Sequence, residues 1–116
     1  MPQFRLRSFQ PKIRENDVEK SCIQILQLRG YKVLRLPVGL FKTLDGRYHP
    51  VGEAGLPDYV ALKGCAQPLF VEVKRPGGKL SPAQEAKIAE LRQAYNLLVA
   101  VVDSPEALAE WLGLHI

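Results

Sequence analysis

The sequence predicts one mixed α/β (α+β) domain in which helices flank a central, mixed β-sheet. Short apolar segments with strand periodicity alternate with segments of helical periodicity, and each helical segment begins at a recognisable cap. The expected order is helix, strand, hairpin, strand, strand, helix, strand and helix, or αβ(ββ)ββαβα. A length of 116 residues suffices for one hydrophobic core, so a single stand-alone domain is expected over residues 1–116.

The first helix is predicted from a capping signal and an apolar face. Asn16 can cap the helix, and Glu19 can complete a capping box three residues later. Gly30 is a typical residue with which to end it. The apolar face consists of Val18, Cys22, Ile25 and Leu26.

The middle of the chain is predicted to be β-structure. Residues 32–37 form a short strand that stops at a proline, and the Asp45-Gly46 pair predicts a two-residue hairpin turn. After an irregular glycine-rich stretch, strands are expected over residues 58–62 and 69–74. Because only a short turn joins these two strands, we expect them to be neighbours.

The second helix has a strong start signal. Ser81 is suited to the N-cap, a proline occupies the first helical position, and Gln84 stands where a capping box needs it. Ile88, Leu91 and Tyr95 recur on one face, so the helix is expected to reach Tyr95 with this face inward.

The C-terminal part is predicted to be a strand and a helix. Residues 97–102 are all apolar, which is typical of a strand that is buried on both faces. Ser104 can cap a last helix that has Trp111 on its inner side and Gly113 as its stop.

Composition favours an intracellular protein without disulfides. With 47% hydrophobic residues the chain can fold unaided, and its two cysteines, Cys22 and Cys65, are expected to be reduced. No apolar run approaches the length of a membrane span, and the basic arm over residues 1–15 lacks the apolar stretch of a secretory signal. We therefore expect a cytoplasmic location, in a bacterial or phage-infected cell, with no membrane partner. The net charge of +4 is compatible with nucleic acid but does not demand it.

One strand carries charges that a buried strand normally lacks. In LFVEVK, residues 69–74, one face is wholly aliphatic and the other presents Glu72 and Lys74. If the two neighbouring strands are paired, Asp58 and Glu72 reach the same end of the sheet, where two carboxylates repel each other unless a cation neutralises them. Mg²⁺ or Mn²⁺ fits such oxygen ligands, and the carbonyl of Val73 can add a third.

These residues resemble a known family. Pro57-Asp58 followed by Glu72-Val73-Lys74 is similar to the PD-(D/E)xK nuclease superfamily, and GLPDYVAL with FVEVKRPGGKLSPAQ resembles its VRR-NUC branch, the virus-type replication–repair nucleases. The resemblance runs from Asn16 to the last helix, and it implies a restriction-endonuclease-like core.

The resemblance also implies roles for individual residues. Asp58 and Glu72 correspond to metal ligands, Lys74 to the catalytic lysine, Glu19 to the acid of the first helix, and Gln84 to the glutamine that opens the helix after the ExK strand. For Glu19 and Gln84 the capping boxes remain a sufficient alternative reason. For Asp58, Glu72 and Lys74 the alternatives are a turn residue and a solvent-facing ion pair on an edge strand.

The function implied is metal-dependent, structure-selective cleavage of DNA. Small members of this branch suggest four-way (Holliday) junctions as the substrate and a homodimer as the active form. Flap or nonspecific cleavage and a catalytically silent DNA-binding module remain alternatives. Mg²⁺ or Mn²⁺ is the expected cofactor, without an organic one. The basic residues expected to contact DNA are Arg5, Arg7, Lys42, Arg47, Arg75 and Lys79.

Overall fold

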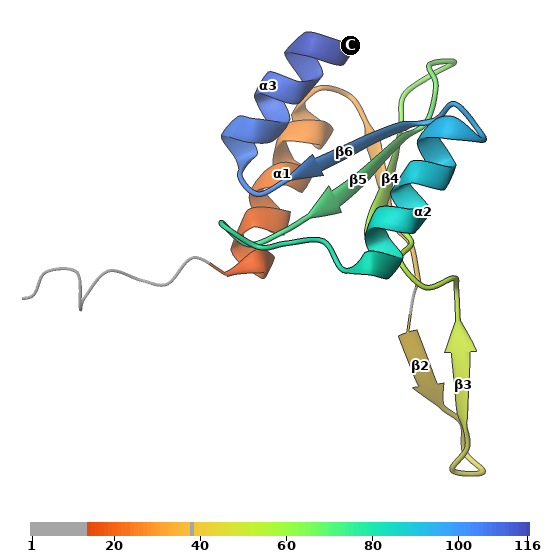
Figure 1. Ribbon diagram of the computed structural model, residues 1–116. Coiled ribbons are helices and arrows are strands. Elements are labelled where there is room, and N and C mark those ends of the chain that lie inside the picture. The colour runs from red at the N-terminus through yellow and green to blue at the C-terminus, as the bar shows by residue number, and fades with distance from the viewer. Residues whose placement is uncertain (1–13, 38) are drawn as a thin grey trace, which may run out of the picture.

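The computed structural model describes residues 14–37 and 39–116 and contains three helices and six strands (Figure 1). Arg5, Arg7 and most of the basic arm lie outside the described residues. The element order is the one the sequence predicts. The bounds are α1 Glu15–Leu28, β1 Lys32–Arg35, β2 Gly39–Lys42, β3 Tyr48–Val51, β4 Tyr59–Leu62, β5 Leu69–Val73, α2 Pro82–Gln93, β6 Leu98–Val102 and α3 Pro105–His115.

A mixed four-stranded sheet forms the centre of the domain, in the order β1-β4-β5-β6. The pairs β1–β4 and β4–β5 are antiparallel, whereas β5 and β6 are parallel because α2 carries the chain back between them. Helices α1 and α3 cover one face of the sheet and α2 covers the other (Figure 1). The predicted fold class is therefore confirmed.

Two apolar clusters hold the helices to the sheet. The larger joins α1 and α3 to the aliphatic face of β5 and includes Leu26, Leu69 and Leu108, all at most 1% exposed. The smaller places Ile88 and Leu91 of α2 against β6. Strand β6 contributes to both clusters, which confirms the prediction that it is buried on both faces although it is last in the strand order.

Strands β2 and β3 form a separate hairpin that projects away from the body of the domain (Figure 1). Its loop differs from the predicted two-residue turn at Asp45-Gly46. Thr43 and Arg47 are paired by a backbone hydrogen bond of 2.9 Å, and Gly46, with φ +83°, is the last residue of a three-residue loop. This type of loop needs one residue with positive φ, and Gly46 supplies it.

The start of α1 corrects the predicted capping box of Asn16 and Glu19. The N-cap is Arg14, and its backbone N–H donates to the Asp17 carboxylate at 3.2 Å. The helix therefore begins two residues earlier than predicted, and Asp17 rather than Glu19 is the acid of the capping box. Glu19 therefore lies inside the helix, where its side chain is free for tertiary contacts.

Two predictions about the C-terminal half were also wrong in detail. Helix α2 ends at Gln93, so Tyr95 lies beyond it and is 64% exposed instead of facing inward. Helix α3 continues through Gly113 to His115, whose ring stacks on Trp111 at 4.2 Å between centroids. Glycine lowers helix stability but does not by itself end a helix whose inner face is packed.

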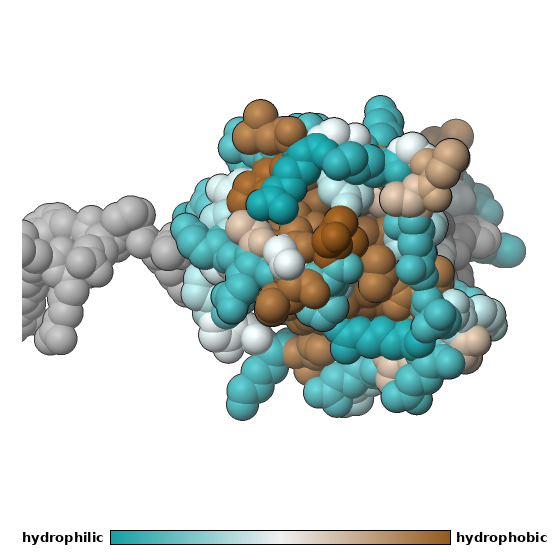
Figure 2. All heavy atoms as spheres, turned by 90° about the horizontal axis from the view of Figure 1, so that it is seen from above, coloured by the Kyte–Doolittle hydropathy of each residue, from teal (hydrophilic) through white to brown (hydrophobic). Residues whose placement is uncertain are grey.

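The far end of the domain exposes apolar side chains. Figure 2 looks onto the end opposite the hairpin and shows hydrophobic residues surrounded by polar ones. Three apolar side chains at this end are more than 60% exposed: Leu28, the last residue of α1, and Leu114 and Ile116 at the end of α3. Cys22 is buried, Cys65 is exposed, and both are free thiols. Among the described residues, no helix is long and apolar enough to cross a membrane.

Candidate active site

Four elements contribute side chains to one end of the sheet, where β4 begins and β5 ends. Asp58 directly precedes β4, Glu72 and Val73 end β5, Glu19 lies near the start of α1, and Gln84 lies in the first turn of α2. The sequence separates these residues by as many as 65 positions (84 − 19), and the sheet pairing brings them together.

Asp58 is fixed by the backbone of both neighbouring strands. Its Oδ2 accepts a hydrogen bond of 3.0 Å from the N–H of Val73, and its own carbonyl accepts one of 2.8 Å from Leu36. The carboxylate is therefore held beside the end of β5, where the sequence predicted that it would meet Glu72.

Glu72 is a buried carboxyl group, at 1% exposure, in a domain whose other buried side chains are nearly all apolar. Its Oε1 accepts a hydrogen bond of 3.0 Å from Nε2 of Gln84, but its Oε2 has no partner among the described residues. Burial and the neighbouring Asp58 carboxyl raise the pKa of Glu72 to about 9, and the charge of Lys74 opposes this only in part. The fold thus places a buried carboxyl group, with one oxygen unpartnered among the described residues, beside a second acid.

Gln84 caps α2 and also contacts the buried Glu72 carboxyl. Its side-chain oxygen accepts from the backbone N–H of Ser81 at 2.9 Å, and its backbone N–H donates to the Ser81 hydroxyl at 3.2 Å, which completes the capping box. Its amide nitrogen then donates to Glu72. The start of α2 is therefore linked directly to the buried carboxyl.

This double role gives a prediction. Gln84→Met should lower the free energy of unfolding by about 1 kcal/mol, through the cap, and should also reduce DNA cleavage because Glu72 loses its donor. Ser81→Ala removes the other half of the same capping box and is the matched control, expected to reduce stability alike but to leave cleavage nearly intact. Thermal unfolding and initial cleavage rates check this. Equal cleavage by the two variants would show that Gln84 acts only as a cap.

Glu19 is engaged by two residues that the sequence did not single out as functional. The Tyr59 hydroxyl donates to Glu19 Oε2 at 2.9 Å, and Arg35 Nη1 lies 3.7 Å from the same oxygen. Arg35 Nη1 also donates to the Tyr59 hydroxyl at 2.8 Å. Burial and Glu19 raise the pKa of Tyr59 to about 12, so the phenol keeps its proton and remains a donor. The ring of Tyr59 is buried in the larger apolar cluster, whereas its hydroxyl reaches the acidic group.

A second carboxylate from α1, that of Glu15, extends the acidic group. One carboxylate oxygen from each of Glu15, Glu19 and Asp58 lies within 4.8 Å of the others. Glu15 was missed, although it stands one helical turn before Glu19 and the i, i+4 spacing places both on one face. Asp58 connects this cluster to Glu72. All the side-chain donors are oxygens, the ligand type that Mg²⁺ and Mn²⁺ prefer.

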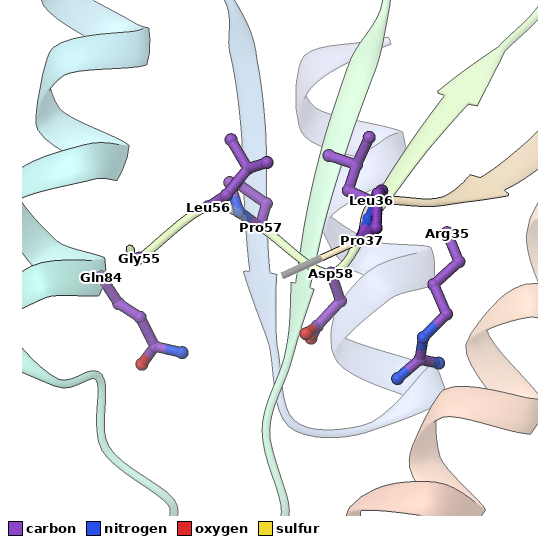
Figure 3. Close-up of a pocket in the computed structure, with 8 residues that line it drawn as sticks. All are labelled: Arg35, Leu36, Pro37, Gly55, Leu56, Pro57, Asp58 and Gln84. Atoms are coloured by element: carbon purple, nitrogen blue, oxygen red, sulfur yellow. The ribbon is translucent and has the colours of Figure 1, made fainter. Parts of the chain in front are cut away.

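A cleft of about 370 Å³ lies beside the carboxylates. It is bounded by the chain that enters and leaves the hairpin, and its polar lining consists of Arg35, Asp58 and Gln84. Figure 3 shows the guanidinium, the carboxylate and the amide pointing toward the same open side. The cleft thus lies next to the acidic side chains at the start of β4, where a ligand can reach them.

The predicted basic residues lie in two separate places. Lys74 is half-buried after β5, where its backbone N–H donates to Val102 at 2.8 Å. Arg75 and Lys79 are exposed on the loop between β5 and α2. On the hairpin, Lys42 Nζ lies 5.8 Å from the centre of the Tyr48 ring, and Arg47 pairs with Asp45 at 3.8 Å.

The mixed four-stranded sheet with helices on both faces, together with the match of the chain to a nuclease family, defines a nuclease-type domain. The model of the VRR-NUC domain matches residues 13–106, and the chain belongs to the VRR-NUC family. A solved structure described as a VRR_NUC domain has a TM-score of 0.67 and 23% sequence identity, and the match covers 88% of this chain and 97% of that one. No curated protein matches the chain. The family gives the chain a nuclease-type function, with DNA as its substrate.

Proposed function

We propose that the chain is a divalent-metal-dependent endonuclease that hydrolyses phosphodiester bonds in branched DNA and cuts four-way (Holliday) junctions as a homodimer. The buried Glu72 carboxyl, with an unpartnered oxygen beside Asp58, is the observation that carries the metal dependence. A carboxyl in this position costs free energy in the folded protein unless a cation compensates its charge. A purely structural role leaves this cost without a reason.

The donor set fits Mg²⁺ or Mn²⁺. Asp58, Glu72 and Glu19 would hold the cation, with the carbonyl of Val73 as an additional ligand. A bound divalent cation supplies Lewis-acid activation of the phosphodiester and of water. Tyr59 and Gln84 orient Glu19 and Glu72 through their hydrogen bonds, so the carboxylates are preorganised rather than mobile.

Lys74 supplies positive charge beside the reacting phosphate. It follows β5 directly and lies close enough to oppose the raised pKa of Glu72. In the proposed reaction the ammonium group orients the attacking water and stabilises the negative charge that develops on the phosphate. An electrostatic role needs only the positive charge of the ammonium group, so it is assigned to Lys74 in preference to that of a general base.

DNA binding is assigned to exposed basic residues on two segments, the hairpin with Lys42 and Arg47 and the loop before α2 with Arg75 and Lys79. Arg5 and Arg7 of the N-terminal arm, which lie outside the described residues, are assigned to DNA from the sequence alone. One small domain offers a single site, whereas a two-fold junction is cut symmetrically by two sites. A homodimer with two-fold symmetry provides them.

Cleavage of a labelled DNA panel tests the proposal. The panel contains a four-way junction, a 5′ flap, a linear duplex and a single strand, each with Mg²⁺, Mn²⁺ or chelator. We expect metal-dependent cuts on opposing strands of the junction, and at least about 10²-fold slower cleavage by Asp58→Asn. Cleavage confined to flaps, or equal cleavage of all substrates, contradicts junction selectivity. Binding without any cleavage in either metal contradicts the nuclease assignment and favours a silent DNA-binding module.

The oligomeric state is tested separately by measuring the mass of the protein in solution, alone and with a junction that it binds. We expect the mass of two chains in at least the complex. A single-chain mass in both conditions, with junction cleavage intact, removes the homodimer from the proposal.

A further inference from the structure

Arg35 occupies a position in the cleft that neither its strand nor its ion pair explains. It is the last residue of β1, and its side chain lines the cleft together with Asp58 and Gln84 (Figure 3). Among the described residues that line this cleft, Arg35 is the only cation. Its side chain remains 68% exposed although three contacts hold it.

These three contacts fix the guanidinium from one side. Nη1 donates to the Tyr59 hydroxyl at 2.8 Å, and the same nitrogen lies 3.7 Å from Glu19. The guanidinium carbon stands 5.4 Å from the centre of the Tyr59 ring. Within residues 14–37 and 39–116, Nη1 is the only nitrogen of this guanidinium that donates a hydrogen bond, so the remaining N–H groups are available to a ligand.

The ion pair with Glu19 does not by itself explain why the Arg35 guanidinium is held in this position. An ion pair at 3.7 Å through a single nitrogen, with the Arg35 side chain largely exposed, contributes little to stability. Tyr59 already satisfies the same Glu19 oxygen with a shorter hydrogen bond. What the arrangement achieves is a guanidinium whose direction is fixed and whose open edge faces the cleft. Such an edge matches the paired oxygens of a phosphate.

We infer that Arg35 binds a backbone phosphate of the DNA strand that enters the cleft, and that Tyr59 is a positioning residue for it. Tyr59 couples two tasks, because one hydroxyl donates to the acid Glu19 and accepts from Arg35. The phosphate-binding position is thereby set relative to the carboxylates. This inference deepens the proposed function and rests on DNA as the ligand of the cleft.

The test measures DNA binding rather than cleavage. Full-length Asp58→Asn protein, which should not cut, is titrated with a four-way junction in Mg²⁺ over a series of salt concentrations. Adding Arg35→Gln should raise Kd about 3- to 10-fold. It should also make the negative slope of log K against log salt shallower by about 0.9, the amount for one phosphate contact on duplex DNA. Arg29→Gln removes the same charge after the far end of α1 and should change neither quantity.

A double-variant cycle tests the positioning role of Tyr59. Tyr59→Phe should raise Kd when Arg35 is present, and it should raise Kd no further when it is combined with Arg35→Gln. An unchanged salt slope in Arg35→Gln, or an equal change in Arg29→Gln, overturns the phosphate contact. Additive effects overturn the positioning role. If the wild type binds DNA but never cuts it, the proposed function fails while the salt slope still decides the inference about Arg35.

Discussion

Glu72→Gln is expected to abolish cleavage and, at the same time, to stabilise the metal-free protein. The buried carboxyl has one unpartnered oxygen and a neighbouring acid, so its ionised form is unfavourable in the fold. The amide keeps the shape and removes the charge. At pH 8 we expect the free energy of unfolding to rise by about 1–3 kcal/mol in chelator. Thermal unfolding of both proteins, with and without Mg²⁺, measures this.

The pH dependence of stability provides a second measurement of the same carboxyl. Its pKa is about 9 in the folded protein and near the ordinary value when unfolded. The folded state therefore binds the proton more tightly, and the stabilisation is fully present below about pH 4 and lost as pH rises toward about pH 9. Metal-free wild type should lose stability over this interval relative to Glu72→Gln.

A matched control separates this effect from the general effect of removing an acid. Glu110→Gln changes an exposed glutamate on α3 and should leave both the stability and its pH dependence unchanged. Mg²⁺ should stabilise wild type and Glu110→Gln at pH 8 but not Glu72→Gln. A Glu72→Gln protein that is less stable than wild type in chelator throughout this range contradicts the assignment of Glu72 as an uncompensated carboxyl.

Gly55→Ala is expected to cause the largest loss of stability among the changes considered for the site. Gly55 has φ +82°, and a Cβ there would stand 2.1 Å from the carbonyl oxygen of Ala83 in the first turn of α2. The backbone must shift to remove this contact, and positive φ adds its own cost. We expect a loss of about 3–5 kcal/mol in the free energy of unfolding, measured by denaturant titration.

Cleavage should fall as well, because the displaced turn of α2 carries Gln84 and hence the donor to Glu72. Gly46→Ala is the control: its φ of +83° is nearly the same, but no atom lies within 4 Å of the added Cβ. It should cost only about 1–2 kcal/mol, for backbone conformation alone. Equal losses for the two variants would mean that the close approach of Gly55 to α2 is unimportant.

The sequence predicts the elements and their order because their signals are local. The Ser81 cap and the alternation in β5 depend on residues a few positions apart, and both were confirmed. The meeting of Asp58 with the end of β5 was also predictable, since a short turn forces neighbouring strands to pair. The catalytic and metal-binding roles of these residues stay predictions.

The contacts that organise the site could not be predicted because they join distant segments. Arg35 and Tyr59 are separated by 24 positions, and Tyr59 and Glu19 by 40. The sequence contains no sign that a tyrosine on the inward face of β4 turns its hydroxyl to an acid on α1. The start of α1 shows a different limit. Asn16 is a better N-cap residue than Arg14, yet the helix begins after Arg14, whose backbone N–H donates to the Asp17 carboxylate.

The hairpin of β2 and β3 has a consequence for how such a domain can change. Its two strands pair with each other and, among the described strands, with none of the central sheet. Two residues added to each strand would extend its tip by roughly 7 Å and leave the register of β1, β4 and β5 untouched. The distance by which the hairpin projects from the domain can therefore change while the ends of β4 and β5, which carry the candidate site, stay as they are.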